Sequence, residues 1–450
     1  MKNNPRNLSV QILNRIEEGG AFAQPLLDSC LSKSTFAKAQ DRGLLTQLVY
    51  GTLRFRNRLD WVIRSTYAGK FESMDTGLKN ILRVALYQIM FADRLPVYAA
   101  TNEAVKTAKK MFPGRSNLVN AILRNAARKM DAIEYPDFDD DPLLHISVLY
   151  SHPLWIVQMW AEQYGIEDTL ALCKSNNDIP PVVIRANGLK TTRSDLLDML
   201  RNCGCEAIPA RYSPDGIVIS NLREPVARMP LYEAGYMQIQ DEASQMIALL
   251  LDPRPGERVL DLCAGVGIKT THMAALMRNK GTITAMDINP QKIEMSLLLA
   301  RRLGATNIEP IVRDAAKDPD NDLCGKFDRV LVDVPCSGMG TLRRNPEIKW
   351  NTKPEDMKQF PPLQKEILHR SAAYLKRGGI MVYSTCTIAS AENEDVVREF
   401  LSAHPDFEYA CPAAFAAGMT EGTGIFRTFP HRHGTDGFFG AVLQKKGKQP

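Results

Sequence analysis

The sequence predicts an α/β protein in which a doubly wound, Rossmann-like sheet follows an all-α bundle and a small α+β domain. Three patterns support this prediction. Apolar residues recur at helical spacing through residues 6–130, helix and strand patterns mix over 145–230, and short apolar strands alternate with helices from about residue 236. A chain of 450 residues has the length for two or three such domains.

Residues 1–130 are expected to form the helical bundle. Apolar stripes at three- and four-residue spacing occur in 8–16, 44–53, 82–90 and 118–123, and the pairs Gly19-Gly20 and Pro113-Gly114 separate helices. This part carries 21 Lys and Arg against 9 Asp and Glu, a net charge of +12, whereas the remainder carries −7. The asymmetry favours binding of a polyanion such as nucleic acid. The alternative is a solvated helical surface that is rich in basic residues.

The middle of the chain is predicted to hold a linker and a small domain. Residues 131–144 contain a polar run with repeated Asp and Pro, which is typical of a linker. Residues 145–235 then combine helices over 153–164, 167–175 and 194–203 with strands over 181–185 and 216–220. We therefore expect a separate α+β domain over 145–235.

Residues 236–450 are expected to form the doubly wound sheet, with strands over 258–261, 281–287, 308–312, 328–333 and 379–384 and a long helix over 353–374. Ligands of such sheets bind beyond the carboxyl ends of the strands. Polar side chains stand at or just after these ends, namely Asp261, Asp287, Asp314, Asp333 and Ser384. This coincidence predicts an active site at that edge.

A glycine-containing loop follows the first of these strands and predicts a cofactor site. Gly265 and Gly267 remove side chains where the backbone must approach a ligand. A dinucleotide fingerprint would require a third glycine at Thr270, and a phosphate loop would require one at Ile268. The acidic residue that opens the loop, Asp261, fits S-adenosyl-L-methionine better than either. Asp287 is then positioned to hydrogen-bond the ribose hydroxyls, and Asp314 to hydrogen-bond the adenine amino group. The alternative is a tight turn whose neighbouring carboxylates bind no ligand.

Two cysteines follow later strand ends and predict covalent chemistry. Cys336 lies in Asp333-Val334-Pro335-Cys336-Ser337-Gly338, and Cys386 lies in Tyr383-Ser384-Thr385-Cys386-Thr387. A helix is expected to start directly after Cys386, and a helix N-terminus favours the thiolate. Two thiols beside a cofactor loop suggest nucleophilic attack on an electron-poor ring. The alternative is that both are inert packing residues.

Other classes of protein are excluded by composition. The chain has nine cysteines without a spacing rhythm, so we expect neither a disulfide framework nor a structural metal. No apolar run approaches the roughly 18 residues that span a membrane. We expect a cytoplasmic location and no metal.

These motifs together resemble the RsmB/NOP family of RNA cytosine-5 methyltransferases, and in particular its bacterial 16S ribosomal RNA branch. The resemblance covers nearly the whole chain, because the helical N-terminus is similar to NusB-like RNA-binding domains. The segments that carry it are Asp261…Lys269-Thr270, Asp333-Val334-Pro335-Cys336-Ser337, Arg343–Trp350, Ser384-Thr385-Cys386-Thr387…Glu392-Asn393, Asp436-Gly437-Phe438-Phe439, Val49–Arg54, Asn102–Val105 and Val119–Arg124.

The resemblance implies roles for the residues that match. Cys386 would add to carbon 6 of the cytosine, Asp333 would contact the base, Cys336 would act in release, and Lys269 would lie near the reaction centre. A flipped or unpaired base is then expected. The S-adenosyl-L-methionine site would comprise Cys263, Ala264, Gly265, Val266, Gly267, Ile268, Lys269, Asp287, Asp314 and Asp333. The implied partner is 16S ribosomal RNA, free or in an early assembly form. The protein itself is expected to be a monomer, with residues 1–130 and 145–235 as RNA-binding parts and 236–450 as the methyltransferase domain.

The cofactor loop departs from the family pattern Ala-Pro-Gly-Gly, because this chain has Gly265-Val266-Gly267-Ile268. A β-branched residue at a position that requires positive φ would be strained, unless the shifted Gly265 takes that conformation. Two alternatives stay open. One is a non-catalytic RNA-binding or assembly factor with a degenerate loop, and the other is a DNA cytosine methyltransferase that uses Cys336 as nucleophile.

Overall fold

The structure is a computed structural model that describes residues 4–33, 36, 40–92, 96–222, 224–411, 419–421 and 424–447. The chain forms two compact units. Unit 1 comprises Met1–Asp178 with Leu342–Lys353, and unit 2 comprises Ile179–Thr341 with Pro354–Pro450. The expected boundaries at 130, 144 and 235 stay predictions.

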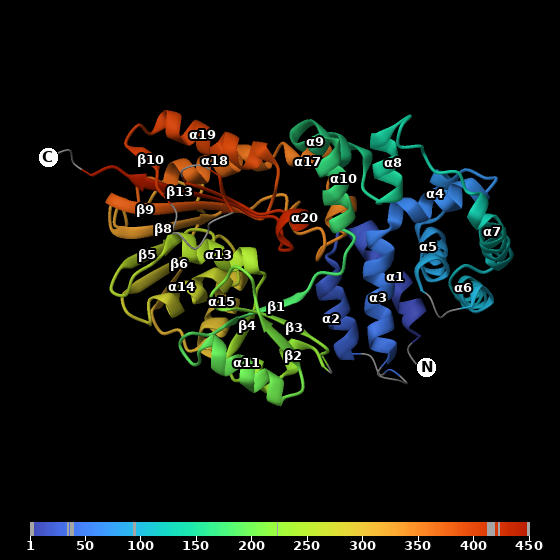
Figure 1. The fold of residues 1–450 in the computed structure, drawn as a ribbon, viewed down its shortest axis with the longest axis horizontal. Coiled ribbons are helices and arrows are strands. Elements are labelled where there is room, and N and C mark those ends of the chain that lie inside the picture. The colour runs from blue at the N-terminus through green and yellow to red at the C-terminus, as the bar shows by residue number, and fades with distance from the viewer. Residues whose placement is uncertain are drawn as a thin grey trace. The chain divides into compact units, whose positions relative to one another are not determined.

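Unit 1 is helical (Figure 1). Its core is the apolar face of several amphipathic helices, and the longest described helices, α1, α3, α5, α6 and α7, contribute most of it. Proline, asparagine and aspartate define several helix starts, as at Asn4 before α1 and Asp75 before α5. The helices are α1 (Pro5–Gly19), α2 (Ala23–Lys33), α3 (Gln40–Arg54), α4 (Arg56–Thr66), α5 (Thr76–Phe91), α6 (Val97–Met111), α7 (Ser116–Lys129), α8 (Pro142–Leu149), α9 (Leu154–Tyr164), α10 (Ile166–Ser175) and α16 (Ile348–Asn351).

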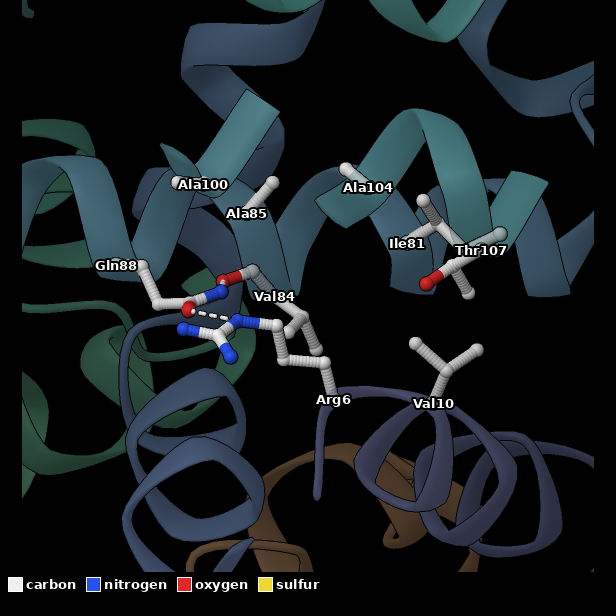
Figure 2. A pocket seen from close by; sticks show the side chains of 9 residues that line it. All are labelled: Arg6, Val10, Ile81, Val84, Ala85, Gln88, Ala100, Ala104 and Thr107. Atoms are coloured by element: carbon white, nitrogen blue, oxygen red, sulfur yellow. Dashed lines mark hydrogen bonds between the residues drawn. The ribbon is translucent and has the colours of Figure 1, made fainter. Parts of the chain in front are cut away.

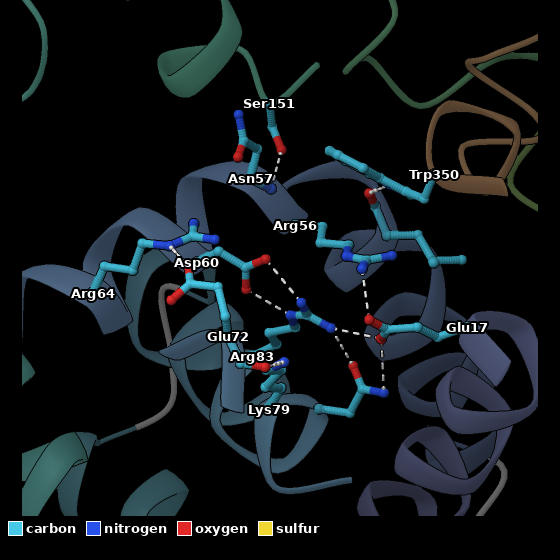
Figure 3. Close-up of polar contacts among 12 residues, drawn as sticks. Glu17, Arg56, Asn57, Asp60, Arg64, Glu72, Lys79, Arg83, Ser151 and Trp350 are labelled. Atoms are coloured by element: carbon cyan, nitrogen blue, oxygen red, sulfur yellow. Dashed lines mark hydrogen bonds and ion pairs between the residues drawn. The ribbon is translucent and has the colours of Figure 1, made fainter. Parts of the chain in front are cut away.

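A charged network joins α1, α4 and α5 inside this bundle (Figure 3). The guanidinium of Arg83 donates two hydrogen bonds to Asp60, at 2.6 and 2.8 Å, and a third to Glu17 at 2.7 Å. Glu17 also accepts a hydrogen bond from Arg56 at 2.6 Å. Because Arg83 is buried, removal of either carboxylate would leave an uncompensated charge in the core.

The segment Leu342–Lys353, although it follows the Cys336 motif in sequence, belongs to unit 1. The carboxylate of Glu347 accepts a hydrogen bond from the backbone N–H of Ala23, the first residue of α2, at 2.8 Å. The buried ammonium of Lys349 donates to the carbonyl of Arg54, the last residue of α3, at 3.0 Å. A carboxylate at a helix N-terminus and a cation at a helix C-terminus both oppose the helix dipole, so these contacts stabilise the two helix ends.

A cavity of about 10 Å³ lies between α1, α5 and α6 (Figure 2). Its lining is mostly aliphatic, and the Nε–H of Arg6 donates to the side-chain oxygen of Gln88 at 2.8 Å beside it. The cavity has room for no more than one water molecule, so it is a packing defect rather than a ligand site.

Unit 2 begins with a small antiparallel sheet, which has the strand order β2-β3-β1-β4. Its buried face packs against helix α11, with Leu196 and Leu200 among the core residues. The elements are β1 (Val182–Ala186), α11 (Arg193–Asn202), β2 (Glu206–Pro209), β3 (Gly216–Ser220), α12 (Pro230–Glu233) and β4 (Met237–Ile239).

The main sheet of unit 2 has the order β11-β12-β13-β9-β8-β5-β6-β7, with β10 also paired to β13. Strands from β9 to β7 in this order are parallel, whereas β13 is antiparallel to β9. The strands are β5 (Arg258–Asp261), β6 (Thr282–Asp287), β7 (Ile308–Val312), β8 (Phe327–Asp333), β9 (Leu375–Thr385), β10 (Phe407–Tyr409), β11 (Thr420–Glu421), β12 (Ile425–Arg427) and β13 (Phe439–Lys445).

Helices cover both faces of this sheet (Figure 1). Alternate residues of β8 face opposite ways: Val330 and Val332 pack with α18 and α19, while Leu331 packs with α13 and α14. The doubly wound prediction is therefore confirmed. The helices are α13 (Glu242–Leu251), α14 (Ile268–Leu276), α15 (Pro290–Leu303), α17 (Pro354–Met357), α18 (Phe360–Ser371), α19 (Glu394–Ala403) and α20 (Pro430–His433).

The predicted long helix over 353–374 is wrong. The structure has two helices, α17 and α18, with Pro361 and Pro362 at the first positions of α18. A proline ring clashes with the preceding turn and removes an N–H donor, so a continuous helix through this pair is excluded. The last predicted residue, Tyr374, directly precedes β9.

Candidate active site

Strands β8 and β9 lie side by side and in parallel, which brings the two cysteine motifs together. Asp333 at the end of β8 is level with Ser384 on β9. The hydroxyl of Ser384 donates to Oδ1 of Asp333 at 2.7 Å, so it fixes one carboxylate oxygen at the strand end. The residues that follow each strand therefore emerge at the same edge of the sheet.

The two thiols meet beyond that edge. The Sγ atoms of Cys336 and Cys386 are 3.3 Å apart, within hydrogen-bond distance for sulfur, and both residues are half-buried. The hydrogen bond to Cys386 raises the pKa of Cys336 well above its ordinary value, and burial acts in the same direction. Either sulfur can donate this hydrogen bond, and the raised pKa keeps Cys336 in its thiol form.

Cys386 does not lie at a helix N-terminus, so that prediction is wrong. Helix α19 begins at Glu394, and only a short 3₁₀ turn over Ser390–Glu392 comes before it. The hydroxyl of Thr385 donates to the side-chain oxygen of Asn393 at 2.6 Å, and the amide of Asn393 donates to the carbonyl of Thr387 at 3.0 Å. These side-chain bonds close a compact loop around Cys386 and postpone the helix.

Lys269 lies beside the thiols and next to the glycine loop. Its ammonium donates to Oδ2 of Asp333 at 2.7 Å and stands 5.4 Å from the ring centroid of Phe438. Burial alone would lower the pKa of Lys269, but the Asp333 carboxylate outweighs burial and raises it, and the charge of Cys386 adds to this increase. Lys269 is therefore held as a cation that acts on both Asp333 and Cys386.

A buried glutamate joins the two cysteine loops. Oε2 of Glu392 accepts hydrogen bonds from the backbone N–H of Ser337 and from the side-chain amide of Gln364, both at 2.9 Å. The same amide of Gln364 donates to the carbonyl of Pro335 at 2.9 Å. Glu392 is fully buried, and burial raises its pKa. Both residues beside Cys336 are thus tied to the loop that follows Cys386.

Backbone contacts between glycines complete this arrangement. The N–H of Gly340 donates to the carbonyl of Cys386 at 3.0 Å, and the N–H of Gly437 donates to the carbonyl of Gly340 at 2.8 Å. A Cβ atom at Gly340 would lie 1.9 Å from the carbonyl oxygen of Gly437. Three loops therefore converge at a position where no side chain fits.

The glycine loop after β5 adopts left-handed backbone conformations at its two glycines. Gly265 has φ +57° and Gly267 has φ +85°, while neither Val266 nor Ile268 is among the residues with positive φ. A Cβ atom at Gly265 would meet nothing within 4 Å, so the backbone there borders open space. The strain expected from the β-branched residues is absent, because the shifted glycine takes the conformation that requires one.

Asp261 opens this loop and is fully buried. Its Oδ2 accepts a hydrogen bond from Thr270 at 2.7 Å, whereas Oδ1 has no hydrogen-bond partner among the described residues. Burial raises the pKa of Asp261 to about 7; the Thr270 bond lowers it in part, and the charge of Asp333 adds to the increase. A buried acceptor without a protein partner fits a site whose ligand supplies a donor or a positive charge.

Two further carboxylates lie at neighbouring strand ends, as the sequence predicted. Oδ2 of Asp287 accepts from the N–H of Gly265 at 2.9 Å, and Oδ1 accepts from the N–H of Asn289 at 2.8 Å. Asp287 therefore also fastens the glycine loop to the end of β6. Asp314 follows β7, is half-buried and accepts from the N–H of Ala316 at 3.0 Å.

Arg185 in β1 reaches this loop from the small sheet, a contact that the sequence pattern does not indicate. Its buried guanidinium donates to the carbonyl of Ile268 at 3.1 Å and to the hydroxyl of Thr271 at 3.5 Å, and Gln240 accepts a further bond. Burial lowers the pKa of Arg185 to about 9, with Asp215 opposing that decrease. The positions of Arg185 and Ile268 are separated by 83 residues, so only folding brings them together.

Across the described residues, no group of three or more His, Cys, Asp or Glu side chains is arranged to hold a metal ion. Among the described helices, none has both the length and the apolar character required to cross a membrane.

Comparison with protein families gives three matches along the chain. Residues 248–444 match the model for 16S rRNA methyltransferase RsmB/F, residues 3–128 match the NusB family, and residues 152–225 match the ferredoxin-like domain of RsmF/B-like methyltransferases.

Curated relatives match over the full length. The probable ribosomal RNA small subunit methyltransferase B of Bacillus subtilis is 36% identical over 99% of this chain and 100% of its own. The protein of that name in Synechocystis is 32% identical over 98% of this chain and 99% of its own. The ribosomal RNA small subunit methyltransferase B of Pseudomonas syringae is 33% identical over 99% of this chain and 98% of its own.

Solved structures of similar fold extend the comparison. The crystal structure of PH0851 superposes with a TM-score of 0.83 at 28% identity, covering 99% of this chain and 100% of that one. A methyltransferase homologue from Pyrococcus horikoshii has a TM-score of 0.58 at 28% identity, and the match covers 68% of this chain and 99% of that one.

Proposed function

This chain belongs to the 16S rRNA methyltransferase RsmB/F family, and from that membership we propose that it methylates carbon 5 of a cytosine in 16S ribosomal RNA through a covalent cysteine–cytosine adduct. The methyl donor of this family is S-adenosyl-L-methionine. The observation that supports the covalent route best is the thiol pair, 3.3 Å apart beside the Lys269–Asp333 ion pair. The proposed domains are 1–130, 131–144, 145–235 and 236–450, and the three family matches support this division.

The residues around the glycine loop fit S-adenosyl-L-methionine. The open space beside Gly265 leaves room for a ligand against the backbone, and the unpartnered Oδ1 of Asp261 suits its positive charge. We assign binding to residues 263–269 with Asp287, Asp314 and Asp333. When bound, the cofactor supplies the methyl group on its sulfonium.

In the proposed reaction the Cys386 thiolate forms a bond to carbon 6 of a flipped cytosine, and the carbon 5–carbon 6 double bond breaks. The electron pair moves toward carbon 5, which becomes nucleophilic. Lys269 stabilises the thiolate before attack through its positive charge. Asp333, held by Ser384 and Lys269, contacts the base near its ring nitrogen.

Release requires that carbon 5 lose its proton to a base, here solvent water. The electron pair of that C–H bond re-forms the carbon 5–carbon 6 double bond, and the bond from carbon 6 to Cys386 breaks with its electron pair left on the Cys386 sulfur. We assign stabilisation of this leaving thiolate to Cys336. The Cys336 sulfur lies 3.3 Å from that of Cys386, within hydrogen-bond distance, and its raised pKa keeps a proton available to donate to the leaving thiolate.

Bisulfite sequencing of ribosomal RNA tests the reaction in cells. A strain that lacks this chain should lose one 5-methylcytosine in 16S RNA, and the wild-type gene should restore it. An unchanged methylation map would rule out the proposed function.

Covalent trapping tests the roles of the cysteines. Cys336→Ala should form an RNA adduct that survives denaturing electrophoresis, whereas Cys386→Ala should form none. The reverse pattern would assign attack to Cys336, as in the DNA methyltransferase alternative. Absence of an adduct in both variants would count against covalent catalysis.

The non-catalytic alternative rested on strain in the cofactor loop, which the backbone angles do not support. Calorimetric titration with S-adenosyl-L-methionine provides the remaining check, because a degenerate site would give no binding heat with or without RNA.

A further inference from the structure

A groove of about 600 Å³ lies in unit 1, between the C-terminus of α4 and one face of α7. This volume is within the range of pockets that hold a small ligand or a nucleotide. Side chains on its floor are apolar and include Leu118 and Ile122, while Tyr67 lines the side formed by α4. Two exposed guanidinium groups, those of Arg124 and Arg128, stand on the α7 side.

The groove residues of α7 share one side of the helix. Leu118, Ile122 and Asn125 are spaced by four and three positions, so they lie in a row, and Arg128 continues that row one turn later. Apart from the arginines, all the lining residues are uncharged. The groove therefore combines an apolar floor with positive charge only.

Contacts within unit 1 hold this face in place. The side-chain amide of Asn125 donates to the carbonyl of Thr66 at 2.8 Å, and Arg128 donates to the side-chain oxygen of Asn125 at 3.0 Å. The ring of Tyr67 packs against the backbone of Gly69, where an added Cβ would lie 2.3 Å from the ring. The aromatic ring and one guanidinium are thus positioned before any ligand binds.

We propose that this groove binds a single-stranded segment of RNA, with an unpaired base against Tyr67 and the apolar floor and flanking phosphates on Arg124 and Arg128. Bases stack on aromatic side chains while arginines follow the backbone in many single-strand sites. The excess of 12 positive charges over residues 1–130 complements a polyanion rather than an ordinary protein surface. The inference rests on the proposed function, since it places part of the same RNA substrate on unit 1.

Fluorescence anisotropy with the full chain and a labelled 12-nucleotide oligouridine tests the proposal. Arg124→Ala/Arg128→Ala should weaken binding roughly 10- to 100-fold and reduce the salt slope by about 1.4, the value for two single-strand phosphate contacts. Tyr67→Ala should weaken binding about 5- to 100-fold without changing that slope, and Tyr67→Phe should bind as the wild type does.

The matched control is Arg15→Ala/Lys33→Ala, which removes the same charge from exposed positions on α1 and α2. If the groove variant and this control show the same affinity and salt slope, the groove is not an RNA site. A protein partner in the groove would give that same result and would also overturn the proposal. Failure of the proposed function is distinguishable, because the wild type would then bind the oligonucleotide yet leave a 16S transcript unmethylated.

Discussion

Gly340→Ala should disrupt the active site from a position that bears no reactive group. The new Cβ would lie 1.9 Å from the carbonyl oxygen of Gly437 and 2.8 Å from that of Cys386, so at least one backbone segment must move by about 1 Å. Both hydrogen bonds of Gly340 would be weakened or lost, at about 0.5–1.5 kcal/mol each. With roughly 1–3 kcal/mol of packing strain, unit 2 should lose about 2–6 kcal/mol of stability.

Two measurements follow from this estimate. The melting temperature of unit 2 should fall by roughly 5–15 °C, and methyl transfer should slow by about 100-fold, because displacement of Cys386 by 1 Å disturbs its alignment with the base. Gly188→Ala is the matched control, since a Cβ there meets nothing within 4 Å and the residue does not have positive φ. A Gly340→Ala protein with wild-type melting and methylation rate would refute the reasoning.

Three further outcomes are expected. Lys269→Met leaves Asp333 without its cation and should lower single-turnover methyl transfer by at least about 100-fold, with Lys269→Arg less affected; equal rates for Lys269→Met and wild type would contradict the assigned role. Burial raises the pKa of Asp261 to about 7, so the folded state holds a proton that the unfolded state releases, and stability should fall as pH rises from about 4 toward 7. Asp261→Asn should remove this pH dependence of the free energy of unfolding, which is at most about 1.4 kcal/mol per pH unit. Urea denaturation of both proteins at pH 5.5 and 7.5 measures it. An equal change in stability between the two pH values for Asp261→Asn and wild type would show that this carboxyl is not the cause. Glu392→Ala leaves the Ser337 N–H without its acceptor, which should cost about 1–3 kcal/mol of stability. It also frees the Cys336 loop, so a long-lived RNA adduct should appear on denaturing gels. Glu392→Gln keeps an acceptor and should not accumulate the adduct.

Several parts of the active site could be predicted because local pattern determines them. Alternation of apolar residues places strand ends to within a few residues, and parallel strands present their carboxyl ends at one edge. The sequence pattern therefore places Asp261, Asp287, Asp333 and the two cysteine motifs at one edge of the sheet. Backbone preference is also a local property: glycine adopts positive φ without strain, and both Gly265 and Gly267 have positive φ.

The helix expected after Cys386 shows where local pattern is insufficient. Residues 387–394 have acceptable helix propensity, but Thr385 and Asn393 form side-chain bonds that stabilise a loop instead. Which of two competing hydrogen-bond patterns wins depends on the strands and loops packed around the segment. Propensity over a window of that length cannot include those contacts.

The sequence by itself determined the order of domains, the edge of the sheet that carries the reactive groups and the positive charge of the first 130 residues. Tertiary structure alone decided that the thiols are 3.3 Å apart, that the pKa of Cys336 is raised, and that Glu392 and Arg185 support loops distant in sequence. It also decided that Leu342–Lys353 packs within unit 1. The physical reason is that periodicity and propensity depend on neighbours a few residues away, whereas burial, desolvation and hydrogen bonds between residues 50 or more positions apart exist only once the chain has folded.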